Sequence, residues 1–336
     1  GLACAQQLNR AGHAVTVFER EDRVGGLLRY GIPDFKLEKW VLDRRLDILE
    51  REGIRFVTGV EAGRDIGADG LQPFDAAVLC IGATVPRDLP IPGRDLAGIH
   101  FAMDYLVPQN RLTAGSHPVD GPKPFISAKD KNVVVIGGGD TGSDCIGTSN
   151  RHKARSVVNF ELLAKPPEGR PDNQPWPFWP MRMRTSSSHE EGAQRCWGIL
   201  TKEFVGRQGS LKSVRTVDVE MVDNGKGGQR LQEINGSQRD WPADMVLLAL
   251  GFTGPEPDSI VGGLGLLLDD HGNIVTDENY MTATAGVFAA GDAHRGQSLI
   301  VWAISVGRDA ARCVDIYLAG QSLLSSTGRG DLAWRG

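Results

Sequence analysis

The sequence lacks any apolar run long enough to cross a membrane. Its longest apolar stretches, residues 76–83 and 245–251, have the length of single strands, whereas a membrane-spanning helix needs about 18 apolar residues. An excess of basic residues is also absent, because the formal net charge is -5 over 336 residues. We therefore expect neither a membrane nor a nucleic acid as a partner.

Closely spaced cysteines are missing as well. The five cysteines all lie more than three residues apart, which excludes a CxxC redox pair, a zinc knuckle and an iron–sulfur ligand run. The odd count and the lack of a secretory leader favour a cytoplasmic location. Patterns such as Ser-His-Asp, HExxH and paired carboxylates are not found, so we predict no catalytic base and no metal ligand.

Glycine, in contrast, is abundant, and two glycine-led segments match each other. The 43 glycines make up about one residue in eight, against about 7% in an average protein. After Gly1, a helix-like stretch reaches Arg10 and an apolar strand ends at Glu19; after Gly142, a helix-like stretch and a strand end at Glu161. Each segment is most of a βαβ unit, and we interpret the pair as an internal duplication.

Buried strands follow in both halves. Residues 75–84 and 244–253 are continuous apolar runs closed by a glycine, which is typical of parallel strands buried on both faces. A third such strand is predicted over residues 286–290, and an apolar-periodic helix over residues 298–318, with Gly320 placed to end it.

These elements predict an α/β fold with two nested Rossmann-like domains. The Pro- and Gly-rich segment 108–131 is interpreted as the connection between the halves. We expect an FAD-binding domain made of residues 1–115 and 281–330, with an NAD(P)H-binding domain, residues 130–280, inserted into it. Because the chain begins at Gly1, directly inside a helix-like stretch, we also expect that an amino-terminal piece is missing.

The sharpest motif is a GxGxxG turn directly after the apolar strand 133–136. Gly137 allows a tight turn, Gly139 gives a pyrophosphate room to touch the backbone, and Gly142 allows close packing of helix on strand. Exposed amides at the amino terminus of the helix that follows would bind the phosphates, and Asp140 and Thr141 within the turn are further candidates for cofactor binding. A glycine-rich turn without a ligand is the alternative.

Glu161 lies where an acid accepts hydrogen bonds from the adenosine ribose. A carboxylate there repels a 2′-phosphate, so Glu161 favours NADH over NADPH. A solvent-exposed strand end is the simpler alternative. Four basic residues close in sequence could instead hold a phosphate, namely Arg151, His152, Lys153 and Arg155.

Gly1 and Glu19 match the end of a second dinucleotide fingerprint, whose first strand and first two glycines are absent. Gly25 and Gly26, shortly after Glu19, would let the chain pass a dinucleotide closely, although a plain turn explains them too.

A third feature follows the predicted strand 286–290. Gly291 and Asp292 come next, where an acid can bind the hydroxyls of a flavin side chain, and Gln297 and Ser298 open the last helix. The amino terminus of a helix favours the negative charge of a reduced flavin.

Several strings in the chain resemble the NADH-type glutamate synthase small subunit. They are residues 133–152 (VVVIGGGDTGSDCIGTSNRH), 159–167 (NFELLAKPP), 175–180 (PWPFWP), 17–39 (VFEREDRVGGLLRYGIPDFKLEK) and 286–308 (GVFAAGDAHRGQSLIVWAISVGR). The resemblance covers nearly the whole chain. Wider relatives are the flavin half of dihydropyrimidine dehydrogenase and related transhydrogenase subunits.

The resemblance implies a role for each site residue. Glu19 would bind the FAD ribose, Gly25 and Gly26 would line the FAD, Asp292 would bind the ribityl chain, and Gln297 and Ser298 would lie near the flavin ring. Gly137, Gly139 and Gly142 would hold the NAD(P)H pyrophosphate. Phe160-Glu161-Leu162, where NADPH-preferring members tend to carry arginines, again favours NADH.

The resemblance also implies a reaction and a partner. Electrons would pass from NAD(P)H to FAD and then, through iron–sulfur clusters, toward FMN in a large glutamate synthase subunit or fused domain, which forms glutamate. The family's cysteine-rich amino-terminal domain, which would hold such clusters, is absent from this sequence. Two alternatives stay open, a related reductase that feeds another iron–sulfur acceptor and an inactive fragment without flavin.

Overall fold

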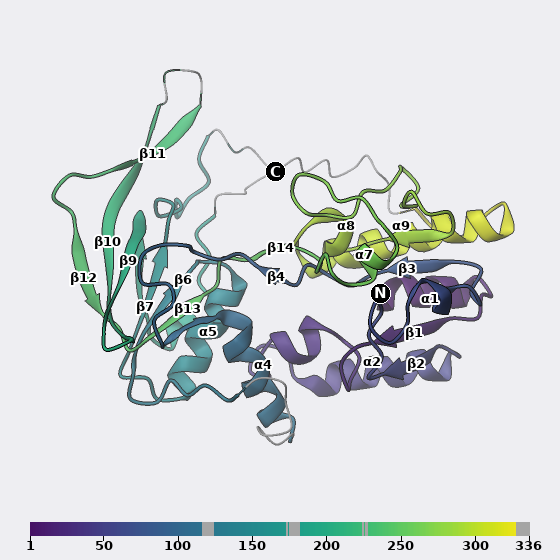
Figure 1. Cartoon of the computed structure of the whole chain (residues 1–336), viewed down its shortest axis with the longest axis horizontal. Coiled ribbons are helices and arrows are strands. Elements are labelled where there is room, and N and C mark those ends of the chain that lie inside the picture. Colours follow the sequence, from purple (N-terminus) through teal and green to yellow (C-terminus); the bar gives the residue numbers. More distant parts are fainter. Residues whose placement is uncertain (116–123, 173, 175–181, 224, 226–227, 327–336) are drawn as a thin grey trace. The chain divides into compact units, whose positions relative to one another are not determined.

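A computed structural model describes residues 1–115, 124–172, 174, 182–223, 225 and 228–326 of the chain. The string at residues 175–180 lies outside the described residues. The chain divides into two compact units (Figure 1). Unit 1 comprises residues 1–29, 38–87 and 251–336, and unit 2 comprises residues 30–37 and 88–250.

Unit 1 is built from short parallel strand pairs and helices. Strand β1 pairs with β2 and strand β15 pairs with β3, both in parallel, whereas β14 pairs with β4 in the antiparallel sense. The strands are β1 Thr16–Glu19, β2 Arg55–Thr58, β3 Ala77–Leu79, β4 Val85–Pro86, β14 Phe252–Gly254 and β15 Val287–Ala289. The helices are α1 Leu2–Arg10, α2 Lys39–Arg51, α3 Ala68–Leu71, α7 Ile260–Gly263, α8 Asp292–Arg295 and α9 Ile300–Ala319.

The long helix α9 covers α1. Cys4 and Leu8 of α1 are buried in one cluster with Ala311 and Val314 of α9 and with Phe288 of β15. These residues recur at helical spacing and face the same side of each helix, which explains why both segments are amphipathic. Gly320, with φ 77, ends α9 in the left-handed conformation, as the sequence predicts.

Unit 2 contains a parallel sheet with strand order β5-β13-β6-β7-β8 and an antiparallel sheet with order β11-β10-β12, in which β9 also pairs with β10. The strands are β5 Ile99–Phe101, β6 Asn132–Ile136, β7 Ser156–Glu161, β8 Gln194–Trp197, β9 Ile199–Arg207, β10 Ser210–Asp223, β11 Gln229–Glu233, β12 Arg239–Pro242 and β13 Met245–Leu248. The helices are α4 Ala102–Thr113, α5 Asp140–Arg151 and α6 Ser187–Glu190. A π-helical turn, Leu27–Gly31, spans the junction between units 1 and 2.

The parallel sheet is buried on both faces. Val133 and Val135 pack in one cluster with Tyr105 of α4 and Ile146 of α5. The alternate residues, among them Val134, pack in another cluster with the antiparallel sheet. Figure 1 shows these helices and the β9–β12 strands beside the parallel strands. Because neither face meets water, β13 and the four residues of β6 after Asn132 are all apolar.

The predicted strands and helices of the two matching segments are confirmed. Helix α1 and strand β1 ending at Glu19 correspond to helix α5 and strand β7 ending at Glu161. The run after Asp244 forms β13, whose four residues are all buried. The last helix begins at Ile300, two residues later than predicted.

The predicted connection over residues 108–131 is wrong at its start. Helix α4 continues to Thr113 and contains Pro108 in its interior. Proline removes one helical hydrogen bond, but Tyr105 and Leu106 are fully buried on the same helix. Tertiary packing therefore outweighs the local preference of proline.

The compact units also have boundaries that differ from the predicted domains. Residues 88–115 group with unit 2 because β5 adds to the edge of the parallel sheet beside β13. Residues 251–280 group with unit 1, where Ile260 and Ile274 are buried with Leu79 of β3. Strands β9–β12, for which the motifs predict no element, form the antiparallel sheet. No helix in the described ranges is long and apolar enough to span a membrane.

Candidate cofactor-binding sites

The glycine turn of unit 2 connects the end of β6 to the start of α5. Gly137 has φ 122, and a Cβ there would lie 2.2 Å from the carbonyl oxygen of Ala249 at the end of β13. A Cβ on Gly142 would lie 2.3 Å from the carbonyl oxygen of Gly137. Two of the three motif glycines are thus required by the close approach of backbone to backbone, as the motif predicts.

The third motif glycine faces open space. A Cβ on Gly139 would meet no heavy atom within 4 Å, and residues 138–140 are exposed. Gly139 is also the N-cap of α5, and no side chain caps the free amides of that helix. Asp140 and Thr141 begin the first turn. A phosphate therefore has room and backbone donors at this turn, and the helix dipole favours negative charge there.

Glu161 ends β7 beside this turn. Its carboxylate fills the space in which Gly138 would carry a side chain, since a Cβ there would lie 2.2 Å from Glu161 Oε2. Glu161 also accepts a hydrogen bond from Nη2 of Arg195 at 2.8 Å. The structure therefore brings Glu161 to the predicted place but pairs it with an arginine that the sequence motifs do not single out.

The basic residues that are near Glu161 in sequence lie elsewhere. Arg151 ends α5 and pairs with Glu191, and His152 is held by Tyr105 and by Gln109. A helix of 12 residues spans about 18 Å, so these residues are at the opposite end of α5 from the glycine turn. Strand β7 then runs parallel to β6. Its last residue, Glu161, therefore lies beside the glycine turn, whereas Arg155, which precedes the strand, does not.

Glu19 of unit 1 occupies the equivalent strand end. Its Oε1 accepts a hydrogen bond from the backbone N–H of Glu21 at 3.0 Å. Burial raises the pKa of Glu19, and the N–H of Glu21 opposes that shift. The carboxylate is thus partly desolvated and has remaining acceptor capacity, which fits a ribose hydroxyl.

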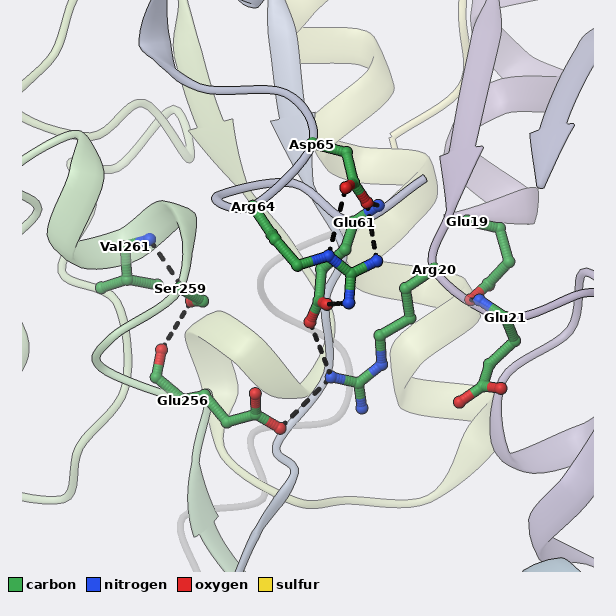
Figure 2. A network of polar contacts seen from close by, with 9 residues as sticks. All are labelled: Glu19, Arg20, Glu21, Glu61, Arg64, Asp65, Glu256, Ser259 and Val261. Carbon is green, nitrogen blue, oxygen red and sulfur yellow. Dashed lines mark hydrogen bonds and ion pairs between the residues drawn. The ribbon is translucent and has the colours of Figure 1, made fainter. Parts of the chain in front are cut away.

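The side chain of Arg20 turns away from Glu19 into a surface network (Figure 2). Its Nη1 lies 3.5 Å from Glu61 and 3.2 Å from Glu256. Arg64 pairs with Glu61 and with its neighbour Asp65. Because the pairs are solvent-exposed, we expect each to contribute less than about 1 kcal/mol. The network connects the segment after β14 to the ends of β1 and β2 within unit 1.

Gly25 and Gly26 form the turn before the π-helical turn. Gly25 has φ 129, and a Cβ there would lie 2.6 Å from Leu42 of α2. A side chain is therefore excluded for a structural reason, and a plain turn accounts for Gly25 without a ligand. At Gly26 a Cβ would meet nothing within 4 Å, so the chain leaves open space at this position.

Gly1 and Gly291 lie at the same edge of unit 1. Gly1 is the N-cap of α1, and a Cβ there would be 3.3 Å from Cys80, which follows β3. Strand β15 runs parallel to β3, so Gly291 and Asp292 follow the neighbouring strand end. Carboxyl ends of parallel strands are the usual place for a nucleotide in such folds.

The residues at the start of α9 contact one another and the strand β14. Ser298 Oγ donates a hydrogen bond to Asp292 at 3.2 Å. Burial raises the pKa of Asp292, and its bonds with Ser298 oppose that shift. Gln297 accepts a hydrogen bond from the N–H of Phe252 at 2.9 Å. The N-cap of α9 is Leu299, without a side-chain cap, so its amides are available to an anion.

Family models match two parts of the chain. The model described as "Pyridine nucleotide-disulphide oxidoreductase" matches residues 199–307, and the one described as "Flavin containing amine oxidoreductase" matches residues 1–32. The solved structure titled "Mycobacterium tuberculosis FprA in complex with NADPH" has a TM-score of 0.72 at 19% identity, covering 95% of this chain and 82% of that chain. Thioredoxin reductase from T. acidophilum has a TM-score of 0.60 at 19% identity, covering 95% of each. The α/β Rossmann-like fold of these oxidoreductases is thereby confirmed.

Curated relatives are much more similar in sequence. The glutamate synthase [NADPH] small chain of Mycobacterium tuberculosis is 51% identical over 96% of this chain, which spans 66% of that protein. The glutamate synthase [NADH] of Schizosaccharomyces pombe is 48% identical over 98% of the chain, which spans 16% of it. The glutamate synthase [NADPH] small chain of Bacillus subtilis is 47% identical over 96% of the chain, which spans 67% of it. By this similarity, the chain belongs to the glutamate synthase small-chain family.

Proposed function

We propose that this chain is the electron-input part of a glutamate synthase, which binds FAD and NAD(P)H. The observation that carries the proposal is the 51% identity over 96% of the chain to a protein named glutamate synthase small chain. In unit 2 a glycine turn joins a strand to an uncapped helix, and in unit 1 a matching glycine-led helix is followed by a strand that ends in an acid, which supports a dinucleotide site in each unit.

In unit 2, the residues of the glycine turn hold the pyrophosphate of the nicotinamide dinucleotide. Backbone N–H groups at the start of α5 bind the phosphates, and Glu161 accepts from the ribose hydroxyls. The residues proposed for this site are Gly137, Gly139, Asp140, Thr141, Gly142 and Glu161.

In unit 1, the proposed FAD site combines the edge of β1 with that of β15. Glu19 accepts from the adenosine ribose, Asp292 accepts from the ribityl hydroxyls, and the start of α9 offers positive potential to an anionic ring. The full set is Gly1, Glu19, Gly25, Gly26, Gly291, Asp292, Gln297 and Ser298. When bound, the flavin supplies redox chemistry that amino-acid side chains lack, so these residues bind and orient and do not transfer protons.

NADH is proposed as the preferred reductant. The Glu161 carboxylate next to the glycine turn repels a 2′-phosphate. Relatives of similar identity are named for NADPH and for NADH, so the preference depends on local residues and not on overall similarity. The proposed acceptor is a large glutamate synthase subunit or a fused domain, in the cytoplasm.

The test is anaerobic titration of the FAD-reconstituted chain with NADH and with NADPH, followed at the visible band of oxidised flavin. We expect NADH to bleach the band and NADPH to do so more weakly. Addition of the large subunit with 2-oxoglutarate and glutamine should then yield glutamate. A chain that binds FAD but is reduced by neither nucleotide contradicts the proposal, and a chain that takes up no FAD favours the alternative of an inactive fragment.

A further inference from the structure

A cluster of charged and aromatic side chains lies where β7 and β8 end. Glu161 is paired with Trp197 in the parallel register of these strands, and Arg195 lies two residues before Trp197 on the same face. The cluster consists of Glu161, Arg195, Trp197 and Lys165. The Arg195 guanidinium lies 4.9 Å and the Lys165 ammonium 5.7 Å from the centre of the Trp197 ring.

Arg195 is held in place by several groups. Its Nη2 donates to Glu161 at 2.8 Å, and its Nη1 donates to the backbone carbonyl oxygen of Arg184 at 3.0 Å. The side chain is only 11% exposed, and that of Glu161 17%. Among the described residues, Nε has no hydrogen-bond partner. A guanidinium has five N–H donors, so this one retains donors that the protein does not use.

The remaining groups near Arg195 leave its charge balanced chiefly by Glu161. His189 is close enough for its pKa to be lowered to about 4, first by burial and then by the charges of Arg195 and Lys36. It is therefore neutral at physiological pH. Lys165 pairs with the exposed Glu168. The carboxylate of Glu161 is thus the main group that neutralises the Arg195 guanidinium. Without this carboxylate, the guanidinium would be free to bind an anion.

We propose that Arg195 is a specificity-determining residue of the dinucleotide site and that it acts through its ion pair with Glu161. With the carboxylate present, the pair is satisfied and the site accepts a ribose with free hydroxyls. Without the carboxylate, Arg195 offers a fixed, bidentate partner to a 2′-phosphate, with Lys165 beside it. This inference rests on the proposed function, because it assumes that a dinucleotide binds at the glycine turn.

A double-mutant cycle on the full chain tests the coupling. The probes are 2′,5′-ADP, a fragment of NADPH, and ADP-ribose, a fragment of NADH, with binding measured by calorimetry. We expect Glu161→Gln to strengthen 2′,5′-ADP binding about tenfold, as a charge-assisted hydrogen bond to a freed guanidinium would, and to weaken ADP-ribose binding. The gain should disappear in the double variant with Arg195→Gln. In the double variant with Arg195→Lys, part of the gain should remain, because lysine retains the positive charge. This variant also serves as a second test if the Arg195→Gln variant folds poorly.

The control is another ion pair of unit 2. Arg215 pairs with Glu203 at 2.7 Å, and it alternates with the buried Val214, so it faces away from the core of the two sheets. Glu203→Gln should leave the affinity for both probes unchanged. If the gain of Glu161→Gln persists without Arg195, the role of Arg195 is refuted while dinucleotide binding stands. If the folded wild type binds neither probe, the proposed function itself fails.

Discussion

Glu19 and Glu161 end equivalent strands but have different surroundings. Glu19 is hydrogen-bonded to a backbone N–H, and burial raises its pKa, whereas Glu161 is ion-paired with Arg195. The two matching segments thus have different electrostatic environments at their strand ends. Both residues occupy the same place in their βαβ segments. Their different electrostatic surroundings therefore come from side-chain contacts.

The raised pKa of Glu19 predicts a conflict between stability and binding. A carboxyl whose folded pKa exceeds its unfolded pKa costs stability as the pH rises above the unfolded pKa, and this cost is complete once the pH exceeds the folded pKa. We therefore expect Glu19→Gln to raise the melting temperature of the FAD-free chain near neutral pH and to weaken FAD binding. Calorimetric melting and FAD titration check both effects. If Glu19→Gln melts at a lower temperature than wild type at neutral pH, and at the same temperature in acid, the predicted gain in stability is contradicted.

Gly139 and Gly142 offer a matched pair of substitutions. A Cβ at Gly142 meets backbone, whereas a Cβ at Gly139 meets nothing within 4 Å. We expect Gly142→Ala to lower the free energy of unfolding by about 1–3 kcal/mol. Gly139→Ala, at an N-cap, should cost about 0.5–1 kcal/mol but should weaken ADP-ribose binding at least about tenfold, because its methyl group enters the space proposed for the pyrophosphate. Urea denaturation and calorimetry measure the two quantities. Normal binding by Gly139→Ala would place the phosphates elsewhere.

At the scale of elements, the helices that open the proposed sites share one property. Gly139 and Leu299 are the N-caps of α5 and α9, and neither makes a side-chain cap, as is also the case for α2 and α4. Relative to a serine or aspartate N-cap, a residue such as leucine costs about 1 kcal/mol and a glycine only a few tenths. The cost is consistent with amides kept available for an anion.

The packing of α1 on α9 predicts a pH dependence. His13, just after α1, lies 2.8 Å from Asp315 of α9. Burial disfavours the charge of Asp315, but bonds with Ser322 and His13 outweigh it and lower its pKa. The stabilisation is therefore complete above the unfolded carboxyl pKa of about 4 and is lost as the pH falls through the lower, folded value.

Asp315→Asn should accordingly destabilise the chain by about 1–3 kcal/mol at neutral pH, and the difference from wild type should shrink in acid. Urea denaturation over a pH series provides the measurement. As a control, Asp47→Asn breaks an exposed pair with Arg51 within α2 and should have little effect. A deficit for Asp315→Asn that grows on acidification would refute the role of the ion pair.

At the scale of the whole molecule, each unit has its own apolar core and its own strand–helix site. Hydrogen exchange with mass spectrometry should therefore show two separate footprints. ADP-ribose should protect residues 132–161 of unit 2, and FAD should protect residues 1–29 and 286–307 of unit 1. Protection by both ligands in the same peptides would contradict the assignment of one dinucleotide to each unit.

The boundaries of the two units could not be predicted from local pattern. Strand β5 joins unit 2 because it pairs with β13, about 147 positions later in the chain. The antiparallel strands β9–β12 cover the second face of the parallel sheet, and their half-exposed, alternating residues give a weaker signal than a glycine motif does. Both are consequences of pairings between distant segments.

The sequence alone determined the elements whose chemistry is local. The glycine turn, the strands that end in Glu19 and Glu161 and the last helix with Gly320 follow from residue spacing, because backbone conformation and burial pattern act over a few neighbouring residues. Only the tertiary structure decided which side chains meet at those elements. Arg195 reaches Glu161, and Arg20 reaches Glu256, because strand pairing brings distant segments together, and no short-range pattern encodes such a contact.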